Sequence, residues 1–215
     1  MTDHVSNRKE PAMKASWRQL ESYPVIPVVW DDHGIEEILH IPVAFVYLQD
    51  GSIFSLEETC RRIKSHQPHA RIFFHIDLAA GIAADEAGVR FAKTCGIDGL
   101  VTTRPSLIEA GKKYGLETVL RAFLQDSRSL RRTLQLCQRC MPDGLDLLPG
   151  PVLPEVMDEI TSVLSQPVIG GGLVRRPEQV WSLLRAGCRA VSTSTPALWA
   201  LNRSSAPVRP SPCGL

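Results

Sequence analysis

Two short segments near the carboxyl end of the chain carry residue types that hold phosphate groups. Residues 170–172 are three consecutive glycines, whose bare main-chain amides can approach an anion closely. Residues 192–194 read Ser-Thr-Ser and add hydroxyl donors, and the segment starting at Pro196 offers the free amides of a helix start. Each segment alone also fits a glycine turn or a polar strand end. Together they define five candidate phosphate contacts: Gly171, Gly172, Ser192, Thr193 and Ser194.

A second group of polar side chains lies within or directly after other apolar runs. Its members are His75, Asp77, Thr103, Arg104, Arg121 and Asp146. His75 fits either a ligand contact or a histidine that satisfies a buried polar neighbour. Asp77 and Asp146 fit either acceptors for ligand hydroxyl groups or partners of Arg121 in an ion pair. Because a buried charge is costly unless paired, we expect a charged network at this place.

The predicted strand ends lack the residues that several kinds of catalysis require. The lysines fall in predicted helices or precede the fold, which removes the nucleophile of a Schiff-base aldolase. One histidine and two aspartates at strand ends make a poor metal site, so neither a metal nor a cofactor is expected. Cys137 and Cys140 form a CxxC without a second pair or a nearby histidine, which favours free thiols. The polar set therefore suits recognition of a ligand.

An arginine-rich segment is the one local feature that bears on nucleic acid. Its basic residues, Arg128, Arg131, Arg132 and Arg139, are accompanied by no acidic residue between 127 and 140. The apolar positions of this segment recur with helical period, so the arginines should point outward. A formal net charge of +1 gives no general attraction for RNA, and any contact must come from such a patch. The patch is either a solvated face or a phosphate-binding footprint for RNA, of which Arg128, Arg131 and Arg132 are the candidates.

The elements that must position these residues alternate along the chain. Eight apolar or β-branched runs predict strands over 25–30, 43–48, 71–77, 99–103, 117–124, 145–148, 167–170 and 190–194. Amphipathic stretches between them predict helices over 35–40, 56–66, 85–95, 106–114, 127–140, 153–164 and 177–186. Ser55 with Glu58 fits a capping box, and Asp126 or Ser127 fits a helix cap.

This alternation predicts an α/β protein built as a compact (β/α)8 barrel of the TIM type. Strands too apolar to face water favour parallel pairing with helices outside, and a count of eight favours closure. The glycine and Ser-Thr-Ser segments would then be phosphate-binding loops after strands 7 and 8, where such barrels often hold phosphate. An open doubly wound sheet is the alternative.

A chain of 215 residues with 44% hydrophobic and 22% charged residues supports one core. We expect a flexible N-terminal segment over 1–23, a single barrel domain over 24–200 and a disordered Pro/Ser-rich tail over 201–215. No apolar run approaches the roughly 20 residues of a membrane span, and the expected location is the cytoplasm. Whether the chain forms a homo-oligomer is left open.

At several of these places the residues resemble one known family, the glycerol-3-phosphate-responsive antiterminators. The likeness runs through HIDLAAG (75–81), DGLVTTR (98–104), RAFLQDS (121–127), LDLLPG (145–150), GGGLVRRPEQV (170–180), AGCRAVSTS (186–194) and Leu198-Trp199. The resemblance implies a barrel that binds glycerol 3-phosphate, with Gly171, Gly172, Thr193 and Ser194 at the phosphate. It also implies a regulator that acts, when liganded, on the leader mRNA of glycerol-utilisation genes and is not an enzyme.

The chain departs from the family pattern at a few positions. Trp30, followed by two aspartates, stands where the family often has a basic residue, and Asp146 stands where a glutamate is common. Loss of a basic contact to phosphate would cost about 1.5 to 3 kcal/mol of binding. Two other functions stay open: a barrel enzyme acting on a small phosphorylated polyol or sugar with Asp77 or Asp146 as general base, and a ligand sensor that acts through a protein partner.

Overall fold

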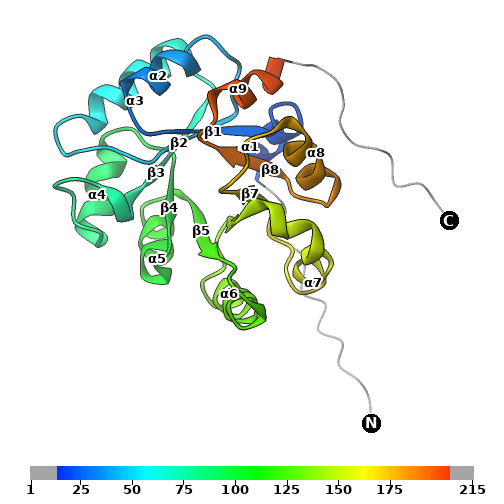
Figure 1. Ribbon diagram of the computed structural model, residues 1–215. Helices are drawn as coiled ribbons and strands as arrows, with labels where there is room; N and C mark the ends of the chain where they lie inside the picture. The colour runs from blue at the N-terminus through cyan, green and yellow to red at the C-terminus, as the bar shows by residue number, and fades with distance from the viewer. Residues whose placement is uncertain (1–13, 204–215) are drawn as a thin grey trace.

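The structure, a computed structural model, describes residues 14–203, in which strands and helices alternate (Figure 1). The strands are β1 (Val25–Val29), β2 (Phe45–Leu48), β3 (Arg71–His75), β4 (Gly99–Thr102), β5 (Glu117–Phe123), β6 (Gly144–Leu148), β7 (Val168–Gly171) and β8 (Ala190–Thr193). The α-helices are α1 (Ala15–Arg18), α2 (Asp32–Ile38), α3 (Leu56–His66), α4 (Glu86–Thr94), α5 (Pro105–Lys113), α6 (Ser127–Cys140), α7 (Met157–Val163), α8 (Pro177–Arg185) and α9 (Pro196–Trp199). Four 3-10 turns complete the elements: η1 (Gln19–Glu21), η2 (Ile76–Leu78), η3 (Gly150–Glu155) and η4 (Ala200–Arg203).

The eight strands form a closed, all-parallel barrel in the order β1 to β8. Helices lie outside this ring, as Figure 1 shows. The predicted TIM-type barrel is confirmed, and the open doubly wound sheet is excluded. All eight predicted strands are present, as is the main helix between each pair of neighbours. Because all strands run the same way, their carboxyl ends gather at one end of the barrel, called the mouth below, and their amino ends at the other, called the base.

Element boundaries differ from the predictions where a backbone turn interrupts the pattern. Strand β3 ends at His75, two residues before the predicted end, and the chain turns there into η2. The helix predicted over 153–164 is divided into η3 and α7, because Pro154 cannot continue a regular helical hydrogen-bond pattern. Apolar periodicity alone does not register these turns.

Helix caps show one success and one correction. The Asp126 carboxylate accepts a hydrogen bond from the Ser129 amide (2.7 Å), which caps α6 as predicted. The capping box predicted for Ser55 and Glu58 is wrong, because Ser55 makes no side-chain cap. Its hydroxyl instead accepts from the Ser52 amide (3.1 Å) and stabilises the loop before α3.

The base of the barrel is closed by the N-terminal helix. The Trp17 side chain of α1 is 1% exposed, and its ring packs edge-on against Phe45 at 5.2 Å between centroids. A side chain at Gly144 would meet this ring at 2.1 Å, so β6 needs glycine there. The indole Nε1 donates to Glu117 (2.7 Å). Trp17 thus fills the lower end of the barrel.

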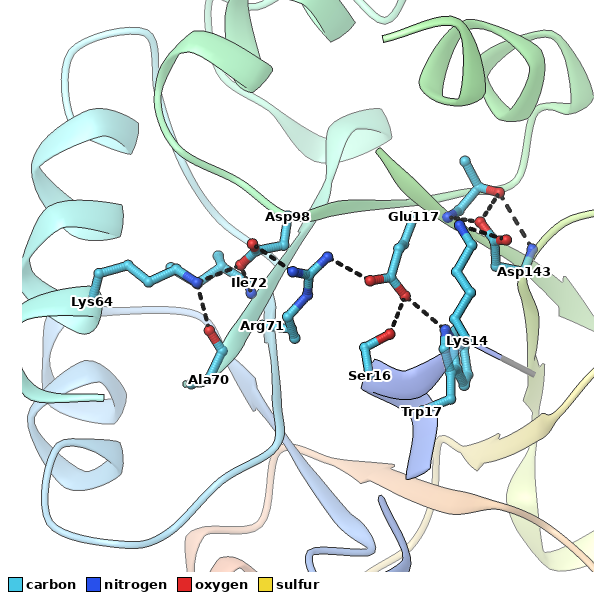
Figure 2. Close-up of polar contacts among 11 residues, drawn as sticks. Lys14, Ser16, Trp17, Lys64, Ala70, Arg71, Ile72, Asp98, Glu117 and Asp143 are labelled. Carbon is cyan, nitrogen blue, oxygen red and sulfur yellow. Dashed lines mark hydrogen bonds and ion pairs between the residues drawn. The ribbon is translucent and has the colours of Figure 1, made fainter. Parts of the chain in front are cut away.

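Charged side chains around Trp17 are paired with one another (Figure 2). The Arg71 guanidinium contacts Glu117 at 2.5 Å and Asp98 at 3.3 Å, and Lys64 reaches Asp98 at 2.7 Å. Glu117 is buried at the amino end of β5. The base therefore contains its own counter-ions.

The domain ends differ from the predicted boundaries. Residues 14–23 were expected in a flexible segment, yet they form α1 and η1, with Trp17 and Leu20 buried. At the other end, Asn202 is buried and bonds both main-chain polar groups of Val25, accepting from its amide (3.0 Å) and donating to its carbonyl (2.8 Å). The remaining parts of the predicted segments, 1–13 and 204–215, lie outside the described residues. No helix in the described range is long and apolar enough to cross a membrane.

Candidate functional site

A cavity of about 480 Å³ opens at the mouth of the barrel. Its polar lining comes from the end of β3, from β5, and from the loops after β2, β7 and β8. The residues with polar side chains or free loop backbone are Gln49, His75, Arg121, Gly172, Leu173, Val174, Arg175, Ser192, Thr193, Ser194 and Thr195. Within the described range this lining holds two arginines and neither a carboxylate nor a lysine. Such a cavity favours an anion.

Arg121 is the buried cation of this cavity. Its Nε and Nη2 atoms both contact Asp146 Oδ2 at 2.7 Å, and its Nη1 donates to Gln49 Oε1 at 3.1 Å. Asp146 is 0% exposed and also accepts from the Ser192 hydroxyl at 3.0 Å. Of the two roles considered for Asp146, the structure therefore has the ion pair with Arg121. A guanidinium has five N–H groups, so two remain for a ligand.

Gly171 lies beneath the cavity, where it gives space to this network. In the parallel register Gly171 is opposite Ser192, so the glycine and Ser-Thr-Ser segments lie side by side as expected. A Cβ atom at Gly171 would lie 2.2 Å from the Ser192 hydroxyl and 2.9 Å from an Asp146 oxygen. Glycine is thus required at position 171, because any side chain there would collide with Ser192 and Asp146, which are hydrogen-bonded to each other.

The loops after β7 and β8 expose main-chain amides to the cavity. In the described residues, the amides of Gly172, Leu173, Val174 and Ser194 donate to no protein acceptor. Gly172 and Leu173 have φ angles of +70° and +58°, and the second value is unusual for a residue with a side chain. The Thr193 hydroxyl donates to the Val174 carbonyl (2.8 Å), which ties the two loops together. Free amides on neighbouring loops that line one cavity can together bind an anion.

His75 lines the cavity, and neither ring nitrogen has a hydrogen-bond partner in the described residues, although the side chain is buried and its Nε2 lies 3.9 Å from Asp77 Oδ2. Burial, and then the positive charge of Arg121, lower the pKa of His75 to about 4 against a weaker opposing effect of Asp77. The imidazole is therefore neutral near pH 7, with one donor and one acceptor available.

Asp77, Thr103 and Arg104 lie together beside the cavity. Asp77 accepts from the Thr103 amide (2.7 Å) and from the hydroxyls of Thr102 (2.7 Å) and Thr103 (2.8 Å). Burial raises the pKa of Asp77, but these hydrogen bonds outweigh it and the pKa is lowered. Arg104 approaches the same carboxylate at 3.9 Å. These three residues join the ends of β3 and β4 and do not line the cavity.

Three residues of the site were missed by sequence reasoning. Gln49 orients Arg121, and the ring of Tyr47 lies 5.9 Å from its guanidinium carbon. The Tyr47 hydroxyl is buried without a partner in the described residues, and burial raises its pKa. Arg175 lines the rim from the β7–α8 loop. The Arg-Arg pair in the 170–180 motif could have pointed to Arg175, whereas nothing in the sequence pairs β2 with β5 across the barrel.

The arginines of α6 lie on the outside of the barrel, as predicted. Arg128, Arg131, Arg132 and Arg139 are exposed, while Leu130 and Leu134 on the opposite side of the helix are buried. Residues 14–203 contain no cluster of three His, Cys, Asp or Glu side chains able to hold a metal ion. The described cysteines are free and buried.

The fold and this cavity define a TIM-barrel protein whose candidate ligand site lies at the carboxyl ends of its strands. Residues 25–199 match the model of the glycerol-3-phosphate responsive antiterminator family. The chain belongs to this family.

Relatives and solved structures agree with this assignment. The chain is 30% identical to the uncharacterised protein YgcP of Escherichia coli K12, over 85% of this chain and 94% of YgcP. A glycerol uptake operon antiterminator-related protein from Thermotoga maritima matches with 30% identity and a TM-score of 0.73, covering 81% of this chain and 96% of that one. A glycerol uptake operon antiterminator regulatory protein from Listeria monocytogenes matches with 29% identity and a TM-score of 0.76, covering 81% and 94%.

Proposed function

We propose that this protein binds glycerol 3-phosphate at the mouth of its barrel and, when liganded, binds the leader mRNA of glycerol-utilisation genes so that transcription continues. The observation that carries the ligand site is the cavity lining, which in the described residues has two arginines, four free amides and no carboxylate. A dianionic phosphate on a small polyol suits both its charge and its size of about 480 Å³.

The phosphate end is assigned to the loops after β7 and β8. The amides of Gly172, Leu173, Val174 and Ser194 would donate to its oxygens, and the Ser194 hydroxyl is exposed nearby. Because Arg121 is neutralised by Asp146, the balancing positive charge must come from elsewhere. Arg175 at the rim is the candidate for this charge. It would take the role of the basic residue that the family often has at the position of Trp30.

The glycerol end is assigned to His75 and Arg121. A neutral imidazole can donate to one hydroxyl and accept from another, and the two remaining N–H groups of Arg121 can donate to hydroxyl oxygens. A ligand at this place would satisfy polar atoms that the protein alone leaves unpartnered. Asp77, Thr103 and Arg104 do not touch the ligand in this assignment but fix the ends of β3 and β4 beside the cavity. Asp146 and Gly171 lie below the cavity and position Arg121 and Ser192.

We infer that the site binds its ligand without chemical turnover. Both carboxylate oxygens of Asp146 are engaged by Arg121 and Ser192, and those of Asp77 by two threonines. Neither is available as a general base. Incubating the protein with glycerol 3-phosphate and phosphorylated sugars should leave them intact by NMR, and a new product above the no-protein control would argue for an enzyme.

The RNA end of the function is assigned to α6. The exposed guanidinium groups of Arg128, Arg131 and Arg132 lie on one outward helix face and can contact phosphates. Since the ligand changes RNA affinity only if it binds one conformation better, each partner should strengthen binding of the other by the same factor.

Fluorescence anisotropy with labelled leader RNA tests this function directly. Affinity should rise by about 5- to 150-fold when glycerol 3-phosphate is added, the range of usual allosteric coupling. Replacing Arg128, Arg131 and Arg132 by Gln should weaken RNA binding and flatten its salt dependence. The control replaces Arg61 and Arg62 of α3, which contact Glu58 and Glu36. Equal RNA affinity with and without ligand at every salt concentration would refute ligand control.

A further inference from the structure

Phe123 is an exposed aromatic residue at the edge of the ligand cavity. It ends β5, is 55% exposed and contributes to the cavity lining. Residues i and i+2 of a strand face the same side, so Phe123 lies on the same side of β5 as Arg121. One part of its ring therefore borders the ligand cavity, and the rest meets solvent.

The charges around the mouth are unevenly distributed. The loops after β4, β5 and β7 and the helix starts that follow them, called the basic half below, carry four exposed arginines against two exposed carboxylates: Arg104, Arg128, Arg175 and Arg176 against Asp126 and Glu178. The loops after β1 and β2, called the acidic half, carry the exposed Asp31, Asp32 and Asp50. A polyanion that approaches the mouth is attracted to the first and repelled by the second. Phe123 belongs to the basic half.

The backbone between Phe123 and the arginines of α6 is fixed. The Leu124 amide donates to the Leu148 carbonyl (2.7 Å), which holds the end of β5. The amides of Gln125 and Asp126 both donate to the Ser129 hydroxyl, at 2.9 and 3.0 Å. The backbone of Phe123 and the first turn of α6 are therefore held in a fixed relation, with Arg128 and Arg131 directly beyond, while the exposed ring of Phe123 keeps its own side-chain rotations.

We propose that the basic half of the mouth is the face on which RNA docks, with an unpaired base stacked on Phe123 and the adjoining phosphates on the arginines of α6. An exposed aromatic ring beside arginines is the arrangement that recognises single-stranded RNA, because stacking holds the base and the cations hold the backbone. The inference rests on the proposed function. It adds the place where the RNA lies and names Phe123 as the residue that contacts an unpaired base.

This placement explains how a small ligand controls a large partner. Ligand bound to Arg121 lies under Phe123 and limits the positions of its ring from below, so the stacking surface is ordered before RNA arrives. The ligand thus acts through a residue that borders both sites. No rearrangement of the barrel is needed.

The test compares three variants of the full chain with saturating glycerol 3-phosphate and labelled leader RNA. Phe123→Ala should weaken RNA binding by about 5- to 150-fold, the factor that corresponds to stacking of one base. Its salt dependence should stay unchanged, because no phosphate contact is lost. Phe123→Trp should retain tight binding. Phe54→Ala, which removes a 94% exposed aromatic from the acidic half, is the matched control and should bind as the wild type does.

The outcomes separate this inference from the function on which it rests. If wild-type protein fails to bind leader RNA with ligand present, the proposed function falls. If wild type binds and Phe123→Ala binds equally well, or Phe54→Ala loses as much, the docking face is refuted and the function stands. If Phe123→Ala instead loses its affinity for glycerol 3-phosphate, measured by calorimetry without RNA, Phe123 is a cavity wall and the stacking role is rejected.

Discussion

The two ends of the barrel treat charge and hydrogen bonding in opposite ways. At the base, a chain of contacts runs through Lys64, Asp98, Arg71 and Glu117 and ends on Trp17 (Figure 2), and one buried atom of it, Arg71 Nε, has no hydrogen-bond partner in the described residues. A hollow of about 360 Å³ also lies there, but its lining cations are already engaged: Lys14 and Arg189 are paired with carboxylates, and Lys112 donates to the Cys140 carbonyl at 3.0 Å. At the mouth, the ring nitrogens of His75 have no hydrogen-bond partner in the described residues, and the main-chain amides of Gly172, Leu173, Val174 and Ser194 have no protein acceptor there.

This difference separates stability from function. Groups paired within the protein need nothing further, so the base can hold the fold together. Groups held apart from any partner in a buried place cost free energy, and they persist where a ligand supplies the missing contacts. Barrels of this type place function at the carboxyl ends of the strands, which is where this one has the cavity lined by these groups.

The largest effect should come from breaking the base. Trp17→Ala removes a buried indole and its hydrogen bond to Glu117, which should lower the free energy of unfolding by about 3–5 kcal/mol. Urea denaturation measures this loss. Affinity for glycerol 3-phosphate should change less than about twofold, and the exposed Trp30→Ala should alter stability by about 0.5 kcal/mol at most. A Trp17→Ala protein of normal stability would contradict the closure of the base by α1.

At the mouth, loss of Arg121 should affect both stability and binding. Arg121→Met leaves Asp146 buried without its counter-ion, which should cost about 3–5 kcal/mol of unfolding free energy and remove ligand binding. Replacing Asp146 by Leu in addition should return most of the stability and none of the binding. A double variant that binds glycerol 3-phosphate as the wild type does would show that the ligand does not use Arg121.

His75 should make the mouth sensitive to acid. Its pKa in the folded protein is about 4 against an ordinary 6.5, so the unfolded chain takes up the proton first as the pH falls below 6.5. Stability is complete above pH 6.5 and decreases as the pH approaches 4, by about 3 kcal/mol for this residue. The difference in unfolding free energy between wild type and His75→Gln should show this decrease. A difference that stays constant between pH 7 and pH 4 would contradict a buried, neutral His75.

The smallest effect should be at the outer edge of the base. Lys14 contacts Asp143 at 2.9 Å, but its side chain is half exposed, so Lys14→Met should cost between about 0.2 and 1 kcal/mol. Thermal unfolding at low and high salt measures this loss, which should shrink as salt rises. A loss as large as that of Trp17→Ala would mean that the exposed pairs, and not the buried ring, secure the base.

Most of the fold could be predicted because each strand is a short apolar run between amphipathic helices. The predictions that were wrong concern features that depend on contacts between residues distant in sequence. Residues 15–18 are too few to show a helical period. Trp17 can be buried because Gly144 has no side chain at that place, and no local sequence pattern reveals this contact. The division of the helix predicted over 153–164 follows from Pro154, which interrupts an otherwise helical apolar pattern.

The site was predictable where strand ends alone determine position. Parallel closure places β7 beside β8, so the glycine segment and the Ser-Thr-Ser segment had to meet. Arg121 and Asp146 are register partners on neighbouring strands, which makes their pairing foreseeable as one of two options. Gln49 was not foreseeable, because it reaches Arg121 across the barrel from β2. Sequence also could not tell that Asp77 turns toward the threonines after β4.

The double hydrogen bond between Asn202 and Val25 has a consequence for synthesis of the chain. The first strand of the barrel gains these two contacts only from a residue made after all eight strands. While the chain is still growing on the ribosome, β1 is an open sheet edge that waits for the last part of the domain. Ending the chain before residue 202 would therefore remove both contacts to Val25 and weaken the seam between the first strand and the last.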